Sequence, residues 1–106
     1  MNITVYCGAS LGNTDIYRKK ASELGTWIGT HHHTLVYGGG RTGLMGTIAD
    51  AVLQAGGSVI GIIPTFLKTP EEAHTALTQL ITVKTMAERK SRMLSLGNAY
   101  IALPGG

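Results

Sequence analysis

The chain has 106 residues, of which 43% are hydrophobic and 14% charged, so we expect one globular domain with its own core rather than a disordered chain. Its net charge is +3 and the lysines and arginines are scattered, which argues against a nucleic-acid partner. The single cysteine, the lack of a recognisable signal peptide and the lack of any apolar run near the roughly 20 residues of a membrane span predict a cytoplasmic protein without a membrane partner.

The chain opens with a β-branched run without charge, residues 3–7, which predicts a buried strand. A glycine-rich loop, residues 8–12, follows it. Asn13 or Thr14 can then cap a helix, whose apolar residues recur every three or four positions up to Ile28. This order of strand, loop and helix is the first sign of an α/β chain.

A second strand is predicted over residues 34–37, and it leads into the glycine-rich stretch 38–46. An amphipathic helix follows, and we expect the glycine pair at 56–57 to end it. Residues 58–63 predict a third buried strand, stopped by a proline. The segment 65–78 has no regular pattern.

The last third of the chain repeats the alternation. Residues 80–83 predict a short strand, Thr85 with Glu88 forms a capping box that starts a helix, and residues 98–103 predict a final strand. Alternating strands and helices predict an α/β sandwich with a mainly parallel sheet, folded as a single domain over 1–106. A strand ending in Leu-Pro-Gly-Gly should feed another helix, so we expect the chain to be truncated after its last glycine.

Three glycine-rich loops follow predicted strand ends, which is where parallel sheets bind ligands: residues 8–12, 38–46 and 105–106. The middle loop contains a G-x-G-x-x-G pattern. That pattern follows the second strand, and no acidic residue lies about 20 positions further on, so NAD is disfavoured. A phosphate held by the loop and the helix start is favoured. A tight turn needed only for packing is the alternative.

Arg89 and Lys90 lie near the start of a predicted helix, where positive charge opposes the helix dipole. An anion bound close by would account for these two positive charges, and Arg89 could bind a phosphate or carboxylate with two hydrogen bonds. A solvated surface pair is the alternative. Glu71 and its neighbour Glu72 could bind sugar hydroxyls or be ordinary surface acids. Ser10, in the first glycine loop, could donate a hydrogen bond to the ligand.

A metal site is not expected. The run 31–33 consists of three histidines, but it follows a helix end and should lie at the opposite edge of the sheet from the glycine loops. Adjacent histidines also point in different directions. Cys7, in the first strand, is interpreted as a small core residue rather than a nucleophile because no partner base is evident.

Four motifs together resemble the LOG (LONELY GUY) family, whose members are often labelled "lysine decarboxylase-like". They occur in order and with family-like spacing over essentially the whole chain: Cys7–Gly12, Tyr37–Gly46, Met86–Lys90 and Leu103–Gly106. The resemblance implies a Rossmann-like three-layer sandwich, a homodimer and no metal or organic cofactor. It also implies hydrolysis of the N-glycosidic bond of a nucleoside 5′-monophosphate, a cytokinin riboside monophosphate or AMP, to free base and ribose 5-phosphate.

The resemblance assigns the catalytic role to Arg89. Substrate-binding residues are expected at Ser10, Gly39, Gly40, Gly43, Met45, Gly46, Glu71, Arg89, Lys90, Pro104, Gly105 and Gly106. The last three match the start of the family's phosphate loop, P-G-G-x-G-T-x-E-E. The glutamates that end this motif, which include the family's catalytic carboxylate, are not among these 106 residues. A binding module of the same fold, which holds a nucleotide without cutting it, is therefore the alternative.

Overall fold

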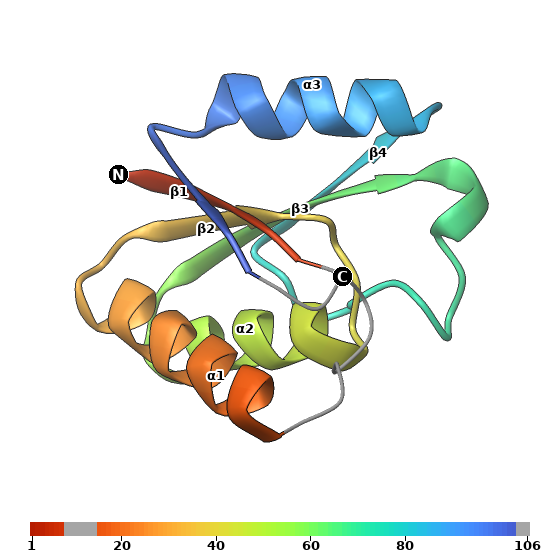
Figure 1. The fold of residues 1–106 in the computed structure, drawn as a ribbon. Helices are drawn as coiled ribbons and strands as arrows, with labels where there is room; N and C mark the ends of the chain where they lie inside the picture. Colours follow the sequence, from red (N-terminus) through yellow and green to blue (C-terminus); the bar gives the residue numbers. More distant parts are fainter. Residues whose placement is uncertain (8–14, 104–106) are drawn as a thin grey trace.

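The sheet has five strands, and every neighbouring pair runs parallel (Figure 1). The computed structural model describes residues 1–7 and 15–103. The strands are β1 (Asn2–Tyr6), β2 (Thr34–Tyr37), β3 (Ser58–Pro64), β4 (Gln79–Val83) and β5 (Ala99–Ala102). Their spatial order is β4-β3-β2-β1-β5. The predicted strands are confirmed to within one or two residues, because buried parallel strands require uninterrupted apolar runs.

Helices cover both faces of the sheet and make three layers, so the predicted Rossmann-like sandwich is confirmed (Figure 1). The helices are α1 (Asp15–Thr30), α2 (Gly43–Gln54) and α3 (Met86–Leu96). α1 and α2 lie together on one face, and α3 lies on the other. None of the helices within residues 1–7 and 15–103 is long and apolar enough to cross a membrane.

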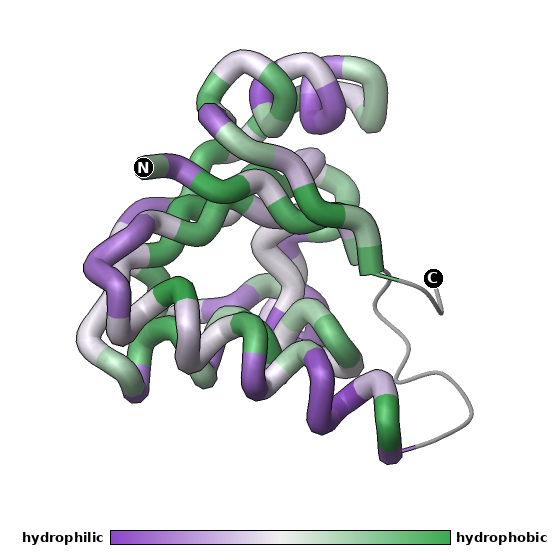
Figure 2. The backbone as a smooth tube through the Cα atoms, turned by 60° about the vertical axis from the view of Figure 1, so that its left-hand side comes forward, coloured by the Kyte–Doolittle hydropathy of each residue, from purple (hydrophilic) through white to green (hydrophobic). Residues whose placement is uncertain are grey.

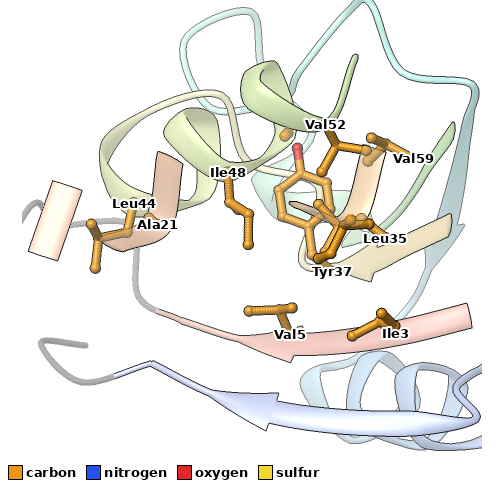
Figure 3. Packing of buried hydrophobic residues seen from close by; sticks show 11 residues of the cluster. Ile3, Val5, Ala21, Leu35, Tyr37, Leu44, Ile48, Val52 and Val59 are labelled. Carbon is orange, nitrogen blue, oxygen red and sulfur yellow. The ribbon is translucent and has the colours of Figure 1, made fainter. Parts of the chain in front are cut away.

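The main core lies between the sheet and the α1–α2 layer (Figure 3). Figure 2 shows the hydrophobic residues following the strands and the inner sides of these helices. The strands contribute Ile3, Val5, Leu35, Tyr37 and Val59, and the helices Ala21, Ile28, Leu44, Ile48, Ala49 and Val52. Burying one large aliphatic side chain of this kind contributes about 1.5–3 kcal/mol. This layer therefore fixes the sheet from which the site is built.

α3 is fastened to the opposite face by a smaller cluster and by its cap. Only Arg89 and Met93 of this helix are buried, and the Thr4 hydroxyl donates to the Met93 carbonyl at 2.8 Å. Half of the predicted capping box is confirmed, since the Thr85 side chain accepts from the Glu88 N–H at 3.1 Å, whereas the Glu88 carboxylate accepts from the Lys84 N–H at 3.4 Å. The cap fixes where α3 begins, and so where Arg89 stands over the sheet.

Candidate functional site

The turn that follows β2 is held by three different donors. The carbonyls of Gly38, Gly39 and Gly40 accept, in that order, from the Arg89 guanidinium, from a backbone N–H at 3.0 Å and from the Tyr37 hydroxyl at 2.6 Å. Gly39 has a φ of +80°, a conformation that favours glycine. In a trans peptide the N–H and the carbonyl point in opposite directions. The Gly39 N–H therefore points away from Arg89, and the Gly40 N–H points away from the backbone donor to Gly39.

The segment between β3 and β4 pairs with this turn. The donor to Gly39 is the His74 N–H, Gly40 forms an antiparallel bridge with Ala73, and the irregular segment is thereby tied to the glycine turn. His74 is buried, and its Nε2 lies 2.7 Å from an Asp50 carboxylate oxygen. Its Nδ1 accepts from the Ala76 N–H at 3.1 Å. Nε2 therefore carries the proton and donates to Asp50. The interpretation as a tight turn thus accounts for the carbonyl groups of residues 38–40, which all accept hydrogen bonds from within the protein.

Arg89 is a buried cation above the carboxyl ends of β2 and β3. It is 9% exposed, its Nε donates to the Ile62 carbonyl at 3.0 Å, and Nη2 donates to Gly38. None of the ion pairs in the described ranges includes Arg89. Burial lowers its pKa from the ordinary arginine value, although it stays charged at neutral pH. A buried charge with spare donors and no carboxylate partner is suited to an anionic ligand.

The guanidinium faces a cavity of about 160 Å³ at the carboxyl end of β1. Its walls come from β1, the glycine turn, α2 and α3: Val5, Tyr6, Cys7, Gly38, Met45, Met86, Arg89, Lys90 and Met93. Three of the four methionines of the chain are among them. Pockets for drug-sized ligands measure roughly 300–1,000 Å³. This cavity can therefore hold only a part of a nucleotide.

The structure brings most of the described candidates together at one edge of the sheet. Arg89, Lys90 and Met45 line the cavity, and Gly39 and Gly40 form the adjoining turn. Two more candidates, Gly43 and Gly46, lie in the first turn of α2. Glu71 is exposed in the segment after β3 and does not line this cavity. Ser10, Pro104, Gly105 and Gly106 lie outside the described residues.

Several residues of this site were not predicted from the sequence. Met86 and Met93 share one face of α3 with Arg89, at spacings of three and four, and this helical periodicity was a usable signal. Tyr37 was predicted as the end of a strand and the first residue of a family motif, without a role of its own in the site. The partner of His74 is 24 residues away in the sequence, and no local pattern reveals it.

Cys7 lies at the edge of the cavity and is half-buried rather than a full member of the core. Burial raises the pKa of its thiol to about 11, and the nearby Arg89 opposes that rise. We expect alkylation by iodoacetamide to be slow at pH 7 and to accelerate up to about pH 11. The folded state holds this proton longer than the unfolded chain, so stability should fall between about pH 9 and 11. A rate that levels off near pH 8.5, as for an ordinary thiol, would contradict this assignment.

The histidine run lies elsewhere. It follows α1, at the other end of β2 from the cavity, and the His31 and His33 rings cluster with Trp27, with His31 stacked on the indole at 4.4 Å. His31 and His33 are two positions apart, so their clustering does not bear on the expectation that adjacent histidines point in different directions. In the residues that the structure describes, no three metal-ligating side chains gather at one point.

Comparisons with known proteins find relatives over almost the whole chain. A family described as "Possible lysine decarboxylase" matches residues 45–106. A protein of Rhodococcoides fascians named cytokinin riboside 5′-monophosphate phosphoribohydrolase is 49% identical, over 99% of this chain and 54% of that protein. The Arabidopsis thaliana protein named cytokinin riboside 5′-monophosphate phosphoribohydrolase LOG1 is 44% identical, over 98% of this chain and 49% of that protein. The chain thus spans about half the length of these relatives.

A solved structure shares the fold. The molybdenum cofactor carrier protein of Chlamydomonas reinhardtii superimposes with a TM-score of 0.82 at 27% identity, over 99% of this chain and 63% of that chain. A molybdenum cofactor binding protein from Rippkaea orientalis superimposes equally well, with a TM-score of 0.82 at 24% identity, over 96% of this chain and 61% of that chain. The second likeness concerns the fold alone.

Proposed function

We propose that this chain, which belongs to the family described as "Possible lysine decarboxylase", acts in the hydrolysis of the N-glycosidic bond of nucleoside 5′-monophosphates. Water would add to C1′ of the ribose, the bond from C1′ to the base nitrogen would break, and the base would leave with a proton. The products would be free base and ribose 5-phosphate. The names of the relatives suggest cytokinin riboside monophosphates as substrates, and the resemblance to the LOG family adds AMP.

One observation carries this proposal: Arg89 is buried at the ligand-binding edge of the sheet, it has no carboxylate partner in the described ranges, and it faces a cavity. Cleavage of a ribosyl bond passes through an oxocarbenium-like cation. A guanidinium would repel that charge at C1′, so it is better placed on an anionic or electron-rich group of the nucleotide. Lys90, exposed beside Arg89, would add a second positive charge for the phosphate.

The test is incubation of the chain with AMP and separation of the products by liquid chromatography. The proposal predicts adenine and ribose 5-phosphate in equal amounts. Adenosine, which lacks the phosphate, is the matched control and should be cleaved far more slowly, because the phosphate supplies binding energy remote from the reacting bond. Equal cleavage of AMP and adenosine would contradict a site built for a monophosphate.

The second candidate is a binding module that holds a nucleotide or related phosphate compound without cutting it. The likeness to a molybdenum cofactor carrier favours it. Calorimetry with AMP separates the two functions. Binding without release of adenine would favour the module, and neither binding nor release would contradict both.

The homodimer and the cytoplasmic location implied above are also part of this proposal. The free Cys7 agrees with a reducing compartment. Light scattering during gel filtration tests the dimer, since the mass should be twice the 11.2 kDa of one chain. A monomer at micromolar concentration would contradict it.

A further inference from the structure

The Tyr37 hydroxyl closes the glycine turn. Tyr37 is the last residue of β2, its ring is fully buried, and its hydroxyl donates at 2.6 Å to the carbonyl of Gly40, three residues further on. Figure 3 shows the ring within the main core, with its oxygen directed toward α2. Burial raises the pKa of Tyr37, so the hydroxyl remains protonated and keeps its role as a donor. One side chain thus joins the start of the turn to its end.

The turn provides one of the two carbonyl anchors of Arg89, whose Nη1 also contacts the Met86 sulfur at 3.8 Å. The guanidinium donates to Gly38 in the turn and to Ile62 in β3. Since this group is planar and rigid, two anchors fix the direction of its remaining N–H groups. The Ile62 anchor belongs to a strand paired on both sides, whereas the Gly38 anchor lies in a run of three glycines next to a residue with φ of +80°. The Gly38 carbonyl is therefore the anchor that needs support.

We propose that Tyr37 is a positioning residue, whose hydroxyl holds the turn 38–40 closed and thereby aims the Arg89 guanidinium into the cavity. The identity of the ligand in this statement rests on the proposed function. The link from hydroxyl to turn to guanidinium rests on the contacts described above. It adds to the site a residue that touches no substrate and contributes to the reaction only through Arg89.

The test is Tyr37→Phe, which keeps the ring in the core and removes only the hydroxyl. We expect hydrogen exchange of the Arg89 Nε–H, followed by nuclear magnetic resonance, to accelerate about tenfold or more. This N–H donates to Ile62, and the rotation that frees it becomes easier once the Gly38 anchor of the same rigid group is loosened. We expect kcat/KM for adenine release from AMP to fall about 10- to 100-fold, since small displacements of positioning groups have effects of this size. A core-filling role for Tyr37 would leave both quantities unchanged.

Tyr100→Phe is the matched control. Tyr100 also donates its hydroxyl to backbone carbonyls, those of Leu94 at 2.6 Å and Gly97 at 2.9 Å, but it is half exposed and lies at the far end of α3. Its variant should preserve the Arg89 Nε–H exchange rate and the release of adenine. Wild-type values in Tyr37→Phe, or equal losses in the two variants, would overturn the proposal.

Two further results keep the test decisive. If the wild-type chain releases no adenine, the proposed function fails, and the exchange of the Arg89 Nε–H alone still decides the role of Tyr37. If Tyr37→Phe does not fold, exchange in the wild-type chain decides it. If the turn and the guanidinium are coupled, hydrogen exchange of the Arg89 Nε–H and of the His74 N–H, which donates to Gly39, should require the same free energy of opening. Separate opening of the Arg89 Nε–H at lower free energy would overturn the proposal.

Discussion

Replacing Arg89 by methionine should reduce adenine release from AMP by about 100- to 1,000-fold, the usual effect of removing one preorganised donor from a reacting group. The expected effect on folding is smaller. Methionine leaves the carbonyls of Gly38 and Ile62 without their charged donor, but it also removes a buried cation that has no carboxylate partner in the described ranges. These two contributions oppose each other, so the free energy of unfolding should change by less than about 2 kcal/mol.

Arg92→Met is the matched control for this change. Arg92 is on the same helix, three residues further on, but it is exposed and lines none of the walls of the cavity. Product release should stay within about twofold of the wild-type rate, since a surface substitution away from the site has little effect. Chromatography of adenine and thermal unfolding of both variants give the two measurements. An Arg89 variant that folds and keeps the wild-type rate would remove this residue from the reaction.

The parts of the fold that sequence reasoning predicted depend on local pattern. Val59, Ile60 and the pair 62–63 are apolar and β-branched, as expected for a strand that is paired on both sides and mostly buried, and this composition makes β3 recognisable in the sequence. The capping box at Thr85 is equally local, since its two partners are three residues apart. The family motifs were readable for the same reason, because each is a short continuous stretch.

The arrangement of the site depends on contacts between distant residues, which a local pattern does not reveal. The carbonyls that anchor Arg89 are 27 and 51 residues away from it in the sequence. An arginine in the first turn of a helix indicated an anion nearby, but its second role, joining β2 to β3, appears only in the fold. The glycine turn is similar. Its sequence predicted a phosphate loop, and the structure adds that Tyr37 and His74 hold its carbonyls.

The Met45 side chain packs closely against the glycines of this turn. A Cβ atom at Gly38 would lie 2.9 Å from the Met45 methyl carbon, and one at Gly40 would lie 2.8 Å from its sulfur. The Met45 side chain therefore lies over the turn and lines the cavity at the same time. The choice between a packing turn and a ligand loop, left open by the sequence, is thus not exclusive.

Gly46→Ala should destabilise the fold by about 3 kcal/mol or more, the upper range for overpacking. Helix propensity alone predicts the opposite sign, because alanine inside a helix is favoured over glycine by about 1 kcal/mol. Packing decides the outcome: a Cβ atom at Gly46, in the first turn of α2, would collide with the backbone carbonyl of Arg41. That backbone cannot yield freely, since the Arg41 N–H donates to the Glu72 carbonyl at 2.9 Å.

Gly56→Ala is the comparison for that prediction. A Cβ atom at Gly56 would meet nothing within 4 Å, so only its φ of +87° opposes a side chain. The cost of that conformation is about 1–2 kcal/mol, clearly less than at Gly46. Urea unfolding of the two variants gives both free energies. If Gly46→Ala proves as stable as the wild type, the start of α2 must shift easily, and the close approach of the Arg41 carbonyl to Gly46 does not constrain the fold there.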